Sequence, residues 1–182
     1  EVLVNDPEIE QIAWNAAKKV VDNPDTQVVE AGLMMGAEDF SEYTVICPSS
    51  FASVGAGGDY PHHSDYFYLD EKAFPTGAAL YAQVAVDYLE KNNLDFVMSN
   101  IDKIDEYGKI INKENDTSNI SVSKFKNMIR YCNIATHPTW LMKKKIYIQL
   151  QGYRNINKCE DYDFVLRALQ DGFKISKMKE ML

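Results

Sequence analysis

Hydrophobic residues recur at helical spacing in four stretches of this chain. The first stretch predicts a helix. Asn5-Asp6-Pro7 supplies a capping side chain and an early proline at its start, and Asn23-Pro24 marks its end. Thr76–Leu89 is apolar around most of its circumference, which predicts a helix buried on more than one side. Two further helices are predicted at 121–132 and from Glu160 to a stop at Asp171-Gly172.

Shorter segments between these helices have the composition of strands. Paired valines, aromatic residues and flanking turn residues predict five of them, at 26–31, 51–54, 95–99, 109–112 and 173–175. A helical turn is predicted within 36–43, polar loops at 55–61 and 114–119, and a turn at Tyr107-Gly108. His137-Pro138-Thr139 interrupts the pattern, and the next clear helix begins only at Glu160. We therefore predict an α/β protein with a mixed sheet flanked by helices.

Composition narrows the class of protein. An apolar share of 46% in 182 residues is enough for a real core and argues against disorder. No apolar run reaches the length of a membrane helix, and the N-terminus lacks a secretory pattern, so we expect a soluble protein without a membrane span. Cys47, Cys132 and Cys159 are odd in number and widely spaced, which favours reduced thiols and a cytoplasmic location.

Charge is distributed unevenly between the two halves. Residues 1–92 hold 4 Lys/Arg against 16 Asp/Glu, whereas residues 93–182 hold 15 against 11. Such asymmetry is typical of separately derived units, although one domain with an acidic and a basic face would give the same count. Charge alone therefore favours a join near the middle of the chain.

Two local features suggest binding of a nucleotide or a nucleic acid, but neither has the residues that such binding needs. The glycine-rich segment 55–61 lacks the Lys-Ser/Thr ending and the glycine spacing of nucleotide-binding loops, and is better interpreted as a loop that delivers His63. Lys143-Lys144-Lys145 lacks interleaved stacking aromatics on an acidic chain, so it is interpreted as a solvated face. We expect no nucleic-acid partner.

Ordered motifs in the first half carry a family resemblance. Residues 1–91 resemble the later catalytic segment of metal-dependent aminoacylases and carboxypeptidases, in the hippurate hydrolase and auxin-conjugate amidohydrolase branch of that metallopeptidase family. One departure is Asp65, where the branch has proline. The matching segments are Asn5-Asp6, Met35-Gly36-Ala37-Glu38-Asp39-Phe40-Ser41, His63-Ser64, Phe67, Asp70-Glu71 and Gly77-Ala78-Ala79-Leu80.

This resemblance implies that His63 binds zinc or manganese and that Glu38 and Asp39 line the substrate site. A catalytic zinc needs about three protein ligands, and the family supplies the others from an earlier segment, so His63 alone leaves the site incomplete. Two simpler interpretations stay open. His62 and His63 are also typical of a solvated pair in a polar loop. Glu38 and Asp39 are also typical of carboxylates at the start of a helix.

A different resemblance covers the second half. Residues 93–182 resemble the later part of the catalytic domain of family 2 glycosyltransferases. The matching segments are 94–100, 104–109, His137-Pro138-Thr139, Gly152-Tyr153 and 160–168, of which the Glu160-Asp161 segment is the most specific.

That resemblance implies an inverting transfer from a nucleotide-sugar donor. Asp161 would take the proton of the acceptor hydroxyl and Glu160 would place the acceptor. The alternative is an acidic helix start, which Asp161 and Asp163 also favour. The family's Asp-x-Asp metal motif lies earlier in its sequences, and Asp102 and Asp105 do not replace it. We therefore expect no efficient transfer.

The two resemblances meet in the helix at 81–92, without a Gly/Ser linker. We predict a hybrid of two partial catalytic domains, 1–92 and 93–182. The leading hypothesis is a chimera with little or no catalysis by itself. The alternatives are a glycosyltransferase-like protein that retains acceptor binding, and an amidohydrolase remnant that takes missing ligands from a partner. Uncovered sheet edges in both segments favour self-association.

Overall fold

The computed structural model describes residues 2–107, 109–113 and 122–181. The predicted loop at 114–119 lies outside these residues. The chain divides into two compact units, Glu1–Tyr88 and Leu89–Leu182, and each is described by itself. The division falls inside helix α4 (Phe74–Lys91). Identification of the units with two separately derived domains stays a prediction.

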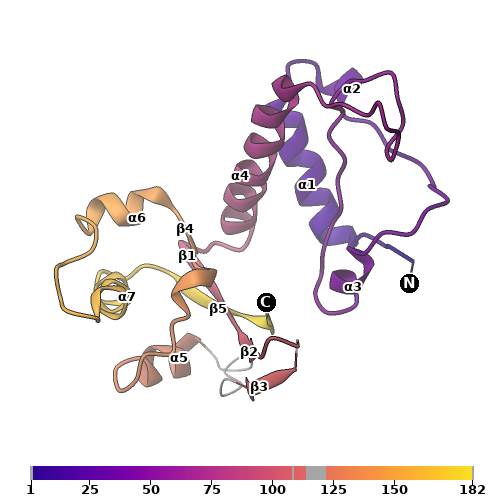
Figure 1. Cartoon of the computed structure of the whole chain (residues 1–182). Helices are drawn as coiled ribbons and strands as arrows, with labels where there is room; N and C mark the ends of the chain where they lie inside the picture. The colour runs from indigo at the N-terminus through magenta and orange to yellow at the C-terminus, as the bar shows by residue number, and fades with distance from the viewer. Residues whose placement is uncertain (1, 108, 114–121, 182) are drawn as a thin grey trace. The chain divides into compact units, whose positions relative to one another are not determined.

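The first unit is built on two helices, α1 (Pro7–Val20) and α4, which lie side by side (Figure 1). Asp6 begins α1 as predicted, because its carboxylate accepts hydrogen bonds from the amides of Glu8 and Ile9. Ile12 and Ala16 are buried. The shorter helices of this unit are α2 (Pro24–Gln27), α3 (Ser41–Thr44) and η1 (Glu71–Ala73).

An ion pair ties α1 to α4. The Lys19 ammonium lies 2.6 Å from the buried carboxylate of Asp87, which also accepts a hydrogen bond from Gln83. Burial opposes ionisation of Asp87, but these hydrogen bonds and the charge of Lys19 outweigh it and lower its pKa below the ordinary value. The pair therefore stabilises the helix contact while Asp87 is ionised.

Two strand predictions in the first unit are wrong. Over 26–31 the chain instead continues from α2, because Pro24 sets the first helical turn and the Val28 amide bonds back to the Pro24 carbonyl. Over 51–54 the backbone is not paired with another strand. The Asn5 side chain takes its place, accepting from the Phe51 amide and donating to the Phe51 carbonyl.

The second unit contains the sheet. Strand β1 (Phe96–Asn100) lies between β4 (Leu141–Met142), which is antiparallel to it, and β5 (Ile175–Met181), which is parallel (Figure 1). A separate hairpin joins β2 (Asp102–Ile104) to β3 (Ile110–Lys113). The mixed sheet and the helices confirm the predicted α/β class.

Helices cover this sheet and complete the core. They are α5 (Val122–Met128), η2 (His137–Thr139), α6 (Lys144–Gln149) and α7 (Glu160–Gln170). All five residues of β1 are buried, as expected for a central strand. The Tyr162 hydroxyl on α7 donates to the Ile129 carbonyl just after α5. The core residues are Phe96, Met98, Phe125, Ile129, Ala135, Ile146, Leu150, Phe164, Val165, Ala168, Phe173 and Ile175.

The lysine run 143–145 was only partly a solvated face, and helix α6 was not predicted. Lys143 and Lys145 each lie 3.4 Å from the Asp95 carboxylate at the start of β1. Burial disfavours charge on Asp95, but the Lys174 amide and the two lysines lower its pKa overall. Behind the lysines, Ile146 and Leu150 are buried one turn apart, which is the helical spacing that the charges obscured.

The first unit leaves many large apolar side chains exposed. Among its described residues, Leu33 and Met35 are fully exposed, and Tyr81 and Val86 on α4 are exposed as well. The sequence predicted that helix α4 is buried on more than one side, and these exposed side chains show that it is not. Across the described part of the chain, no helix is both long and apolar enough to cross a membrane.

Candidate functional site

Asp161 lies in the first turn of α7, at the N-terminal end of the helix. Its carboxylate is half-buried and accepts a hydrogen bond from the Tyr162 amide at 2.6 Å. Glu160 precedes it and is exposed. The Cys159 side chain makes no capping hydrogen bond, so the acidic residues of this turn complement the helix dipole. The alternative interpretation of Asp161 as a helix-start carboxylate is therefore compatible with its position.

A tyrosine from another segment lies near this carboxylate, and a histidine contacts that tyrosine. The Tyr153 hydroxyl is 3.0 Å from Nε2 of His137, the first residue of η2. Burial raises the pKa of Tyr153, and the charges of Tyr147 and Asp161 raise it further. Tyr153 therefore stays a neutral hydrogen-bond donor at neutral pH, close enough to Asp161 to feel its charge.

Aromatic rings form one side of the same region. Trp140 packs against His137 at 4.5 Å and edge-on against Phe96 at 4.9 Å, measured between ring centroids. Tyr153 packs on Phe164 at 5.1 Å. Trp140 thus packs against the core. Its indole Nε1 is nevertheless buried without a hydrogen-bond partner among the described residues.

Asp163 links α7 to the loop that carries Tyr153. Its carboxylate accepts hydrogen bonds from Arg167 Nε at 2.8 Å and from Arg154 Nε at 2.9 Å, and also binds Arg154 Nη2. The hydrogen bonds from Arg154 contribute most to lowering the pKa of Asp163, and Arg167 lowers it further although burial opposes this. Asp163 is therefore ionised and held between two guanidinium groups.

Arg167 also fixes the backbone of that loop. Its two terminal nitrogens donate to the carbonyls of Leu150 at 2.6 Å and Gly152 at 2.8 Å. Gly152 has a φ of 71°, and a Cβ there would lie 2.9 Å from the Tyr147 hydroxyl oxygen. The contacts of Arg167 make it an anchor of the loop.

The carboxyl end of β1 borders the η2 turn. The Ser99 amide donates to Thr139 Oγ1 at 2.9 Å, and the Thr139 hydroxyl lies 2.8 Å from the Thr136 carbonyl. These bonds hold η2 against the end of the central strand. Because ligands of open α/β sheets bind outside the carboxyl ends of the strands, this end is where a site is expected.

The structure does not bring the predicted site residues of the first unit, Glu38, Asp39 and His63, together in one described cluster. Glu38 and Asp39 are exposed just before α3; Glu38 accepts a hydrogen bond from the Phe40 amide, and both backbone carbonyls accept bonds from the helical turn. These contacts match the helix-start alternative. A substrate role for the two carboxylates stays a prediction.

His63 is exposed in a turn and has a φ of 66°. Its neighbour His62 packs edge-on against Phe67, with ring centroids 5.1 Å apart. Within the described ranges, no group of three or more His, Cys, Asp or Glu side chains is placed to hold a metal ion. The residues around His63 therefore do not fit a catalytic zinc or manganese, which needs about three protein ligands.

Two features of the second site were missed from the sequence. His137 was recognised only as part of a matching segment, and its contact with Tyr153 across 16 positions has no local signal. The Asp163 carboxylate was interpreted only as a helix-start residue. Its i,i+4 spacing with Arg167 was the one available hint of an ion pair.

The first segment is similar to known peptidases and hydrolases. Residues 1–87 match Peptidase family M20/M25/M40, whose members are typically metal-dependent. An IAA-amino acid hydrolase ILR1-like 6 from Arabidopsis thaliana is 40% identical over 83 residues, which is 42% of this chain and 18% of that protein. Thermostable carboxypeptidase 1 from Saccharolobus solfataricus is 32% identical over 93 residues, 48% of this chain and 22% of that protein.

Glycosyltransferases give partial and more distant matches. An uncharacterized glycosyltransferase from Methanocaldococcus jannaschii is 28% identical over 96 residues, which is 52% of this chain and 33% of that protein. The chain thus spans about a third or less of the curated relatives it matches. No solved structure matches it significantly.

Proposed function

We propose that residues 93–182 carry the acceptor side of an inverting glycosyltransferase site, centred on Asp161. The observation that carries this proposal is the grouping of Asp161, Tyr153 and His137 beside Trp140, at the carboxyl end of β1. The partial similarity to glycosyltransferases supports it.

In the proposed chemistry, a sugar hydroxyl lies against the Asp161 carboxylate. Asp161 accepts its proton as the hydroxyl oxygen forms a bond to the anomeric carbon of a nucleotide-sugar donor, and the bond from that carbon to the diphosphate breaks. Tyr153 donates a hydrogen bond to the acceptor sugar. The exposed Glu160 carboxylate accepts a hydrogen bond from a second hydroxyl of that sugar. The exposed ring of His137 offers a flat surface to the sugar.

Saturation-transfer NMR with a panel of monosaccharides tests acceptor binding. We expect at least one sugar to respond with the native chain, and the response to weaken in Asp161→Ala and Tyr153→Phe. Asp171→Ala is the matched control, because Asp171 is exposed at the other end of α7. Responses that are absent for every sugar, or unchanged in both site variants, would refute the proposal.

We further propose that the chain is a fusion of two enzyme segments with little or no catalysis by itself. The peptidase match ends at residue 87, and the compact units divide after Tyr88, so similarity and structure change at nearly the same place. Assays with a nucleotide-sugar and with N-acyl amino acids plus zinc or manganese test this. We expect rates no higher than those of Asp161→Asn and His63→Ala.

The third candidate is a metal-dependent amidohydrolase segment, which the peptidase-family match favours. In that function His63 would bind the metal, and further ligands would come from a partner chain. Amidase activity that appears only when a partner is added, and that is lost in His63→Ala, would establish it over the other two.

We also propose self-association, which the exposed apolar residues of the first unit support. Leu33, Met34 and Met35 are adjacent and extensively exposed, which is unusual for a monomer. We expect a dimer or larger species in sedimentation velocity, and a shift toward monomer when all three are replaced by serine. Ile148→Ser, which removes an exposed apolar side chain in the second unit, is the control. A clean monomer of the native chain would contradict this proposal.

A further inference from the structure

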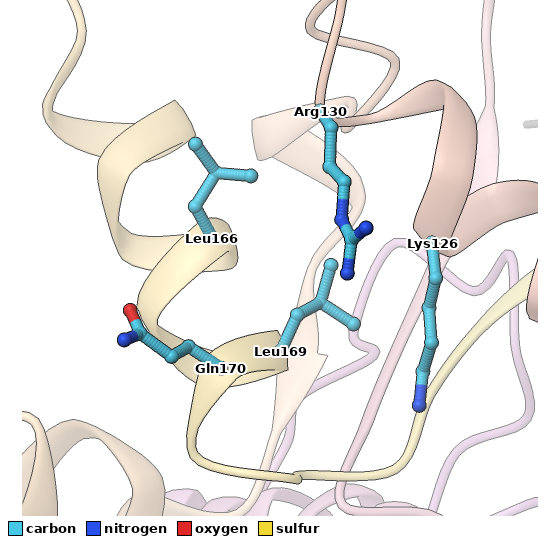
Figure 2. Close-up of a pocket in the computed structure, with 5 residues that line it drawn as sticks. All are labelled: Lys126, Arg130, Leu166, Leu169 and Gln170. Atoms are coloured by element: carbon cyan, nitrogen blue, oxygen red, sulfur yellow. The ribbon is translucent and has the colours of Figure 1, made fainter.

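A pocket of about 310 Å³ lies between α5 and the C-terminal half of α7 (Figure 2). It is lined by Lys126, Arg130, Leu166, Leu169 and Gln170. Leu169 follows Asp161 by eight residues on α7, which corresponds to roughly 12 Å along the helix. The pocket is therefore separate from the proposed acceptor site, and all of its lining belongs to the second unit.

The walls of this pocket differ in chemistry. Leu166 and Leu169 lie one turn apart on α7 and form an apolar wall, with the Gln170 amide beside them. Lys126 and Arg130 come from α5 and the turn after it, and Figure 2 shows their charged ends extending in the same direction. The Leu166 side chain points toward Arg130 in the same view.

The two cations have no carboxylate partner in the described part of the chain. This contrasts with the other basic pairs of the unit: Arg154 and Arg167 share Asp163, and Lys143 and Lys145 share Asp95. Neighbouring like charges four positions apart repel each other, and an anion between them would relieve that repulsion. The negative end of the α5 helix dipole would by itself favour cations at these positions. It does not account for the cavity or for its leucine wall.

We propose that this pocket binds a small organic anion with an apolar body, of the class of medium-chain carboxylates. The carboxylate lies between Lys126 and Arg130, and the hydrocarbon chain packs on Leu166 and Leu169. Its volume is at the lower end of ligand pockets, about 300–1,000 Å³, so a ligand of roughly ten heavy atoms fits.

Calorimetric titration of the whole chain with octanoate tests the proposal. We expect saturable binding with a Kd of about 1 mM, at least fivefold weaker binding of the neutral octanamide, and weaker binding of inorganic phosphate. Lys126→Gln and Arg130→Gln should each weaken octanoate binding about three- to fivefold. Lys144→Gln removes the same charge on α6, outside the pocket, and should leave the affinity unchanged.

Binding that does not saturate would overturn the proposal. So would equal affinity for octanoate and octanamide, or unchanged affinity in Lys126→Gln and Arg130→Gln. The octanamide comparison needs no variant, so it stays decisive if a substitution alters folding. Asp161→Ala should keep octanoate binding, which separates the outcome for this pocket from that for the acceptor site.

Discussion

Replacing Arg167 should loosen the loop that carries Tyr153 and destabilise the second unit. The substitution Arg167→Met keeps an unbranched side chain of similar reach but removes the guanidinium. It would delete two hydrogen bonds to the carbonyls of Leu150 and Gly152, and one of the two cationic partners of Asp163.

The expected cost follows from these contacts. Each hydrogen bond from a charged donor contributes about 1.5 kcal/mol when it is partly shielded from water. Asp163 keeps Arg154 as a partner, so it does not become an isolated charge and the full penalty of a broken buried pair does not apply. We therefore expect the free energy of unfolding to fall by about 2–3 kcal/mol.

Urea unfolding followed by Trp140 fluorescence measures this change, because Trp140 lies in the second unit. Trp14 belongs to the first unit and is replaced by phenylalanine in all samples to remove its signal. Arg154→Gln is the matched control: Arg154 is the more exposed partner of Asp163, so its loss should destabilise the unit less than Arg167→Met does.

The pH dependence provides a second check on Arg167. The pKa of Asp163 is lowered from its ordinary value of 3.8, so its ion pairs stabilise the fold above about that pH and are lost as pH falls through the folded-state pKa. The stability difference between the native chain and Arg167→Met should therefore shrink below pH 4. A loss under 0.5 kcal/mol at pH 7, or one that is the same at pH 3 and pH 7, would refute the reasoning.

Three further outcomes are expected. Gly152→Ala should destabilise the second unit by about 1–2 kcal/mol in the same Trp140 assay, because its φ is left-handed and the added Cβ meets the Tyr147 hydroxyl; no change would contradict this. Lys19→Met should destabilise the first unit by only about 1 kcal/mol, because Lys19 is half-exposed and its charge is screened by solvent. The loss, measured by Trp14 fluorescence, should disappear as pH falls through the folded-state pKa of Asp87. Metal analysis should find no stoichiometric zinc or manganese in the native chain; a bound ion that is lost in His63→Ala would show that the site is completed elsewhere.

Elements with strong end signals could be predicted from the sequence. Asp6 and Pro7 place the start of α1, and Gly172, with a φ of 84°, follows the end of α7. The strand predicted at 95–99 also overlaps most of β1. These signals are local, so they do not depend on which other segment packs against them.

Strands that depend on a partner were predicted poorly. Val29 has a strong strand preference but is exposed and has no strand beside it in the described structure. Asp105 was assigned no role in a turn from the sequence, whereas its carboxylate accepts hydrogen bonds from the amides of Tyr107 and Lys109 in the turn of the β2–β3 hairpin. Strand propensity without knowledge of pairing could not separate these cases.

The candidate site divides in the same way. Asp161 and Glu160 were identified because they are adjacent in a specific motif. The contact of His137 with Tyr153, and the bonds of Arg167 to the loop carbonyls, join segments that only the fold brings together. Sequence reasoning therefore found the carboxylates and missed the groups that surround them.

The most direct test of the proposed acceptor site follows the imidazole of His137 by NMR. In a chain labelled with ¹⁵N-histidine, the Nε2 resonance of His137 is recorded during titration with the sugar that gives the strongest saturation-transfer response. A saturable shift that disappears in Asp161→Ala is predicted, because His137 contacts Tyr153 beside that carboxylate. Sugar binding that leaves the His137 resonance unmoved would contradict the central claim.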